Sequence, residues 1–285
     1  MAVYERTYRR YEGELTPARS RFLILPRYAY QEVFKSKAFI AFLALCALSP
    51  LGFAIVIYLH HNLQALKAIN LPLDKLVPID ATFFSIFVTA QSFLAFLLAF
   101  AVGPGLISAD VRNNALPLYL SRPFSRSEYV LGKMSVLLIL LSAITWIPGL
   151  LLFLLQTSLE GTSWGFEHAG LAWAILASCW EWILVLSLLT LALSAWVKWK
   201  PVARIALLAV FFVTRGFGEA VDRVLDTEWG SLVSLGKLNE IVRADLFGTP
   251  LVSIPVWTAW LALGLVALAC LAMLARRVRA YEVVR

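Results

Sequence analysis

Residues 170–197 read GLAWAILASCWEWILVLSLLTLALSAWV, and this run contains a single charged residue, Glu181. An α-helix rises 1.5 Å per residue and the hydrocarbon core of a bilayer is about 30 Å thick, so about 20 apolar residues cross it. In lipid every backbone amide needs a partner within the protein, which a helix provides. The stretch therefore predicts a membrane-spanning helix.

Similar runs recur along the whole chain. We expect spans near 39–59, 83–108, 130–155, 170–197, 202–220 and 253–275. The 285 residues are 60% hydrophobic and 15% charged, with a mean hydropathy of +0.78, whereas soluble domains are nearer half apolar and a quarter charged. The runs lack the alternation of a transmembrane barrel. The predicted fold is an all-α integral membrane protein with six transmembrane helices in a domain covering 39–275.

The distribution of positive charge predicts the orientation. Nineteen of the 25 Lys and Arg residues fall in segments that six spans place on one side of the membrane, and five fall on the other side. The positive-inside rule makes the rich side cytoplasmic. We therefore expect the tails 1–25 and 276–285 and the loop 109–129 to be cytoplasmic, in a cell (inner) membrane, with segment 221–252 outside. The net charge of +7 follows from this bias and favours anionic lipids, without calling for nucleic acid.

The segment before the first span has its own pattern. Residues 26–38 read PRYAYQEVFKSKA, with apolar side chains at helical spacing between charges. This predicts a short amphipathic helix on the cytoplasmic membrane face, with Pro26 in its first turn. The alternative is an ordinary basic stretch beside the membrane.

The connection between the second and third runs is polar but not uniformly so. Residues 108–134 read SADVRNNALPLYLSRPFSRSEYVLGKM, with three arginines. Ser125 and Glu128 have the spacing of a capping box, which starts a helix leading into the third span. Pro104 and Gly105 can bend the end of the second span. The exposed apolar cluster indicates a contact surface, and its members are Leu116, Leu118, Tyr119 and Leu120.

This loop resembles that of the membrane subunits of ABC-2 type ABC transporters, the permease family that includes sodium, drug and nitrous-oxide-reductase-maturation exporters. In that family a pattern GxxxIsxE…GTLxxLLsxPvsRxeillGK follows the second span. The matching residues here are Gly105, Ile107, Ser108, Leu116, Leu120, Ser121, Pro123, Ser125, Arg126, Gly132 and Lys133. Asp110 stands for the usual glutamate, and Asn114–Ala115 stands for the usual Gly–Thr. The six-span layout and the helix before the first span also resemble the family.

The resemblance implies that the loop is a coupling helix that docks on a separate ABC ATPase subunit. The residues expected to make this contact are Asp110, Arg112, Leu116, Leu118, Tyr119, Leu120, Pro123 and Arg126. The chain has no Walker A motif, because serines stand at 127 and 231 where the pattern needs glycine. We therefore expect no enzyme activity and no bound cofactor here, with ATP and Mg on the partner subunit. The resemblance also implies a second permease, either another copy or a homologue, and export as the direction.

Charges inside the spans need a separate explanation. Glu181 lies well inside the fourth predicted span, where a carboxylate costs at least ~2.5–3.5 kcal/mol unless it is paired or protonated. Arg215 lies at a comparable depth in the fifth span, so we expect an intramembrane Glu181–Arg215 pair. A polar substrate or proton site, or a subunit interface, is the alternative for Glu181. No metal site or catalytic residue is predicted, because the three cysteines fall in spans without a CxxC motif.

A second class of function remains open at this point. A six-span bundle could serve as a scaffold or anchor subunit of a larger membrane complex without transporting anything. Copurification with an ATPase would favour the transporter. The composition of the spans leans towards lipid-like cargo, but lipid-facing walls have the same composition, so the substrate stays undetermined.

Overall fold

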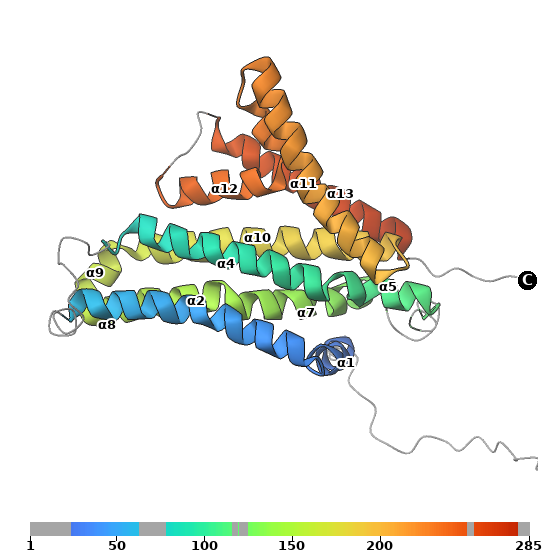
Figure 1. The fold of residues 1–285 in the computed structure, drawn as a ribbon, viewed down its shortest axis with the longest axis horizontal. Helices are drawn as coiled ribbons and strands as arrows, with labels where there is room; N and C mark the ends of the chain where they lie inside the picture. Colours follow the sequence, from blue (N-terminus) through green and yellow to red (C-terminus); the bar gives the residue numbers. More distant parts are fainter. Residues whose placement is uncertain (1–23, 63–77, 116–118, 120–124, 250–253, 279–285) are drawn as a thin grey trace, which may run out of the picture.

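The computed structural model describes residues 24–62, 78–115, 119, 125–249 and 254–278, and its regular elements in these ranges are helices (Figure 1). In chain order they are α1 (Ile24–Val33), α2 (Lys37–His61), α4 (Ala81–Val102), α5 (Pro104–Arg112), α7 (Arg126–Ile144), α8 (Trp146–Glu160), α9 (Thr162–Glu167), α10 (Ala169–Trp196), α11 (Lys200–Leu225), the 3-10 helix η3 (Trp229–Val233), α12 (Leu235–Leu246) and α13 (Val256–Arg277). This confirms the all-α prediction.

Six helical segments in the described ranges are long and apolar enough to cross a membrane, as the sequence predicted. They are Lys37–His61, Ala81–Arg112, Arg126–Glu160, Ala169–Trp196, Lys200–Leu225 and Val256–Arg277. Two of them are broken helices. The second span changes from α4 to α5 at Gly103, and the third changes from α7 to α8 at Thr145.

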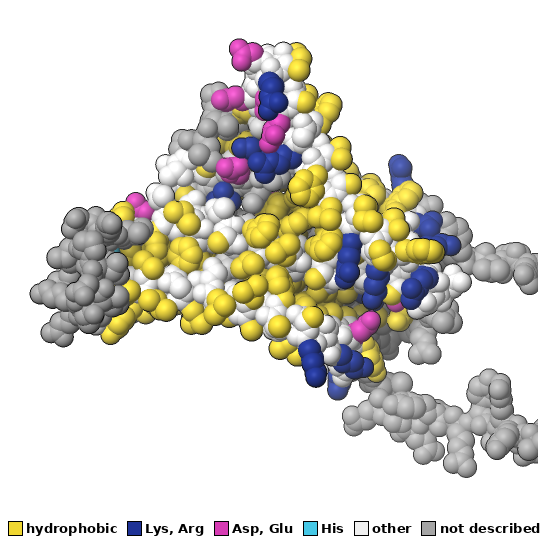
Figure 2. Space-filling view, in the orientation of Figure 1, with side chains coloured by type: hydrophobic (Ala, Val, Ile, Leu, Met, Phe, Trp, Pro, Cys, Tyr) yellow, Lys and Arg dark blue, Asp and Glu magenta, His cyan; other side chains and the backbone are white. Residues whose placement is uncertain are grey.

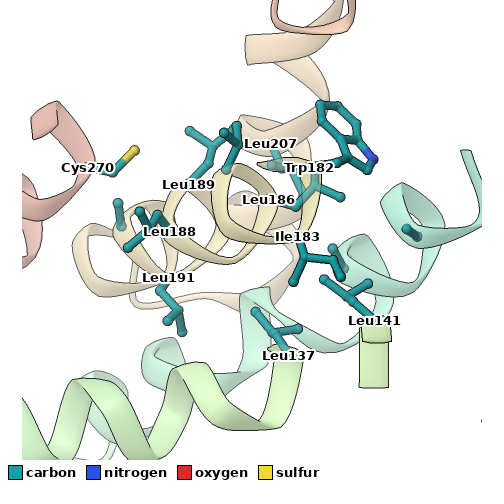
Figure 3. Packing of buried hydrophobic residues seen from close by; sticks show 14 of the residues in the cluster. Leu137, Leu141, Trp182, Ile183, Leu186, Leu188, Leu189, Leu191, Leu207 and Cys270 are labelled. Carbon is teal, nitrogen blue, oxygen red and sulfur yellow. The ribbon is translucent and has the colours of Figure 1, made fainter. Parts of the chain in front are cut away.

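Helix α10 is the centre of the bundle. In its most apolar window 78% of residues are buried, against 11% for α2 and 17% for α11. Figure 3 shows its side chains packed among those of neighbouring helices, with labelled residues Leu137, Leu141, Trp182, Ile183, Leu186, Leu188, Leu189, Leu191, Leu207 and Cys270. The outer helices α2, α11 and α13 expose long apolar faces instead, as helices in contact with lipid or another membrane subunit do.

The spans alternate in direction, so several helix ends meet at one end of the molecule. The start of α2, the end of α5, the starts of α7 and α11 and the end of α13 all lie on the right in Figure 1. Figure 2 shows Lys and Arg side chains gathered over this end, near α1, α5 and the start of α11. Apolar side chains cover the middle, and a second charged region with both signs lies near the end of α11. An apolar band bordered by a basic end is what a helix bundle presents where it leaves the bilayer on its cytoplasmic side.

The helix before the first span differs in length from the prediction of 26–38. It runs from Ile24 to Val33, and α2 begins at Lys37 because the side chain of Ser36 caps it by accepting from the Phe39 N–H. The α1 helix packs against α7, where the Tyr30 hydroxyl donates to backbone carbonyls at 3.4 Å. Burial there raises the pKa of Tyr30 to about 12. That α1 lies on a membrane face stays a prediction.

Candidate functional site

The two ends of the predicted coupling loop are joined at their base by one carboxylate. Asp110 lies in the last turn of α5, and its Oδ2 accepts a hydrogen bond from the Tyr129 hydroxyl at 2.7 Å. The same oxygen is 2.8 Å from Nζ of Lys133. Tyr129 and Lys133 stand four residues apart on α7 and so share one helix face. We call Asp110, Tyr129 and Lys133 the loop base.

The loop base is largely removed from water. The Tyr129 side chain is fully buried, and the Lys133 and Asp110 side chains are only 11% and 15% exposed. A charge-assisted contact in such a place is stronger than one on the surface, and removal of one partner leaves the other buried and unpaired. The loop base therefore fixes the spacing and relative orientation of α5 and α7 where the chain leaves one helix and enters the other.

The end of α5 is closed by a regular hydrogen-bonding motif. Ala115 N–H donates to the carbonyl of Asp110 at 2.9 Å, and Asn114 N–H donates to that of Val111 at 3.4 Å. These are the two bonds of a Schellman motif, which needs a left-handed residue between helix and exit. Asn114 occupies that position with φ of 50°. Asparagine tolerates this conformation better than other non-glycine residues, which explains how it can stand where the family pattern has glycine.

The start of α7 carries the predicted capping box. Ser125 Oγ accepts from the Glu128 N–H at 3.2 Å, and the Glu128 carboxylate accepts from the Ser125 N–H at 2.7 Å. The prediction of this cap is confirmed. The loop thus has a defined exit at Asn114 and a defined entry at Ser125.

Above the loop base, α5 is attached to α4 through a break at Gly103–Pro104. Ser194 of α10 supports the broken backbone, since its Oγ accepts from Ile107 N–H at 3.1 Å and from Ser108 N–H at 2.9 Å. It also donates to the carbonyl of Pro104 at 2.9 Å. Gly103 lies so close to Thr190 of α10 that a β-carbon there would clash. The central helix therefore holds the joint on which α5 and the loop depend.

The predicted contact residues have different surroundings. Arg112 and Arg126 are exposed, as a docking surface requires. The ring of Tyr119 is partly buried and lies 5.8 Å from that of Tyr129, and burial together with the charge of Asp110 raises its pKa. Asp110 is turned into the loop base instead of the surface. Leu116, Leu118, Leu120 and Pro123 lie outside the described residues.

Three residues of this site were absent from the predicted contacts. Lys133 matched the family pattern, but only the structure gives it a partner. Tyr129 carried one usable signal, because it precedes Lys133 by one helical turn and so faces the same side. Ser194 carried none, since its role depends on how α10 packs against the break in the second span.

The predicted Glu181–Arg215 pair is wrong. Arg215 is 63% exposed at its side chain and pairs with Glu219 on its own helix at 2.9 Å. Its partner lies one turn away on the same face of α11, as side chains four residues apart do. Glu181 is 7% exposed on the buried side of α10, and neither carboxylate oxygen has a hydrogen-bond partner among the described residues.

The cation that acts on Glu181 comes from the predicted outer segment. Helix α12 folds back onto α10 and α13 and buries Arg243, which is 8% exposed. Burial lowers the pKa of Arg243, and the acidic groups of Glu240, Cys179 and Glu181 oppose this. Glu181 and Arg243 are close enough to interact electrostatically, although no contact within 4 Å joins them in the described part of the chain.

Comparison with known families decides what kind of protein carries this loop. The sequence pattern described as ABC-2 family transporter protein matches residues 30–228. The chain belongs to the ABC-2 transporter family. The ABC-2 match runs from α1 to just beyond the end of α11, so it contains the loop, both helices that bracket it and the α4–α5 joint. A comparison with curated proteins gave no match. The protein is a multi-pass membrane subunit of the permease type.

Proposed function

We propose that this ABC-2 chain is the permease subunit of an ATP-driven exporter and that its 109–129 loop docks on a separate ATPase subunit. The observation that carries this is the loop base. A docking element transmits force only if it moves as one body with its helices, and Asp110 ties the last turn of α5 to Tyr129 and Lys133 of α7. A plain solvated loop has no need of such a buried tie.

Further features support the same proposal. Arg112 and Arg126 are exposed beside the loop base, where they can meet acidic groups of a partner. The joint at Gly103–Pro104 sets the direction of α5 relative to α4, and α10 supports it through Ser194. The loop and the basic end belong on the cytoplasmic side by the positive-inside rule, where ATP is available.

The exposed apolar faces of α2, α11 and α13 support a second permease as a further partner. Each of these helices is long enough to span the membrane but is mostly uncovered by its own chain. A second copy or a homologous permease is the occupant we propose for part of this surface, with lipids on the remainder. ATP and Mg then belong to the ATPase subunits.

Purification of the complex from its native membrane in mild detergent tests the docking role. We expect an ATPase subunit in equal amount with the wild-type chain, and its loss when Leu118→Asp and Tyr119→Asp are combined. Phe166→Asp is the matched control, because Phe166 is 84% exposed and lies beyond the opposite end of the third span. If no ATPase copurified with the wild-type chain and the double variant still assembled with its other partners, the transporter proposal would be wrong. The non-transporting scaffold would then be the favoured function.

A further inference from the structure

A cavity of about 630 Å³ lies at the basic end of the molecule, between α1, the start of α2, α5 and the start of α11. Side chains from α1 and α2 make one wall apolar, notably Leu25, Phe39 and Phe42. Gly105 keeps the opposite side open, since a β-carbon there would approach the Lys200 side chain. The cavity therefore combines an apolar wall with a cationic end.

Two cations of α11 form that end. Lys200 and Arg204 are one helical turn apart and both line the cavity. The N-terminus of α11 lies beside them and has no side-chain cap, so its partial positive charge adds to theirs. Together these groups favour an anion at one place in the cavity.

The acidic groups that face the cavity leave part of this charge uncompensated. Lys133 is matched by Asp110 at 2.8 Å in the loop base. Glu32 is 3.8 Å from Lys200, and both of their side chains are well exposed, so that pair is weak. Arg204 donates to the carbonyl of Ala101 at 3.0 Å, and its Nε is buried without a partner. Among the described residues no carboxylate pairs with Arg204.

The position of the cavity selects the chemistry of the ligand. The cavity lies at the junction between the apolar band and the basic end, the depth at which lipid headgroups meet acyl chains (Figure 2). A free inorganic anion would use the cations but leave the apolar wall in contact with water. An anionic amphiphile satisfies both parts of the cavity at once.

We propose that this cavity binds an anionic phospholipid of the basic-side leaflet, with its phosphate between Lys200 and Arg204 and an acyl chain against Phe39 and Phe42. Asp110, Lys133 and Tyr119 line the same cavity. Bound lipid therefore fills the space between α1 and the loop base and holds the loop base in place. This consequence for coupling depends on the proposed function, but lipid binding itself does not require an ATPase.

Native mass spectrometry of the purified full-length chain tests the site, with titration by phosphatidylglycerol and by phosphatidylcholine. We expect one phosphatidylglycerol to be retained in preference to phosphatidylcholine. Combining Lys200→Gln with Arg204→Gln should weaken this binding about 30-fold, since each basic residue near a lipid surface contributes about a factor of five. Combining Lys198→Gln with Arg276→Gln removes the same charge from exposed positions outside the cavity and should leave the binding unchanged.

A second variant removes the space and keeps the charge. Ala38 is exposed and lines the cavity, so Ala38→Trp should exclude the acyl chain and abolish retention of the lipid in a folded chain. The proposal is overturned if the cavity variant (Lys200→Gln with Arg204→Gln) and the control variant (Lys198→Gln with Arg276→Gln) lose phosphatidylglycerol binding equally. It is also overturned if Ala38→Trp retains the lipid fully. Displacement of the lipid by millimolar inorganic phosphate would make the site a phosphate site and overturn the assignment to a lipid. These results do not depend on an ATPase, so they can fail separately from the proposed function.

Discussion

The Tyr129 hydroxyl donates a hydrogen bond of 2.7 Å to the Asp110 carboxylate, and this bond joins the helix before the coupling loop to the helix after it. The same carboxylate holds Lys133 at 2.8 Å. The loop therefore projects from a closed base. Asp110 and Lys133, which occupy two positions of the ABC-2 pattern, form an ion pair with each other inside this chain.

Replacement of Asp110 tests the loop base directly. Asp110→Asn leaves the Lys133 ammonium buried without a counter-charge, and we expect a loss of about 1–3 kcal/mol in the free energy of unfolding. Tyr129→Phe removes only the neutral donor and should cost about 0.5–1.5 kcal/mol. Thermal unfolding in detergent measures both. A double-mutant cycle of Asp110→Asn and Lys133→Gln should show that the effects of these two changes are coupled. Additive effects of Asp110→Asn and Lys133→Gln on the free energy of unfolding would refute the ion pair.

The left-handed residue at the end of α5 gives a second prediction. Asn114→Gly should be tolerated, while Asn114→Val should destabilise the protein by about 1–2 kcal/mol because a β-branched side chain clashes at φ of 50°. The control is Asn113→Val, since Asn113 is also exposed but has φ of −87°. The unfolding midpoints of Asn114→Gly and Asn113→Val should both lie above that of Asn114→Val. Equal unfolding midpoints for Asn114→Val and Asn113→Val would contradict the Schellman motif at the end of α5.

Two buried serines of α10 offer a matched comparison. Ser194→Ala removes the group that serves the backbone of Pro104, Ile107 and Ser108, and should cost about 1–3 kcal/mol. Ser187 is equally buried but its hydroxyl has no partner among the described residues, so Ser187→Ala should cost little. Thermal unfolding distinguishes them. If Ser187→Ala proved as damaging as Ser194→Ala, support of the α4–α5 joint would not be the reason.

The features that hydropathy and local spacing control were predictable from the sequence. Each of the six spans lies over one apolar run, because the bilayer sets a length that the chain must match. The Ser125–Glu128 cap was predictable because its two partners are three residues apart. The α4–α5 break was expected from Pro104 for the same local reason, since proline lacks the N–H that would continue the helix.

Contacts between helices were not predictable in the same way. Depth along a span can be counted from the sequence, but the face on which a residue lies against its neighbours cannot. Arg215 has a depth comparable with that of Glu181 yet faces outward, so the pair predicted from depth alone does not form. Arg243 lies on the short amphipathic helix α12, whose low hydropathy gives no sign that it folds back onto α10.

The relation between Glu181 and Arg243 provides the last prediction. Arg243→Gln removes the buried cation that acts on Glu181, and its effect on the free energy of unfolding should be coupled to that of Glu181→Gln by about 0.5–3 kcal/mol. Arg215→Gln removes an exposed pair with Glu219 and should have a small effect that adds to that of Glu181→Gln. Two double-mutant cycles by thermal unfolding compare these cases. Coupling of Glu181 to Arg215, with none to Arg243, would reinstate the pair expected from sequence and contradict the placement of α12 against α10.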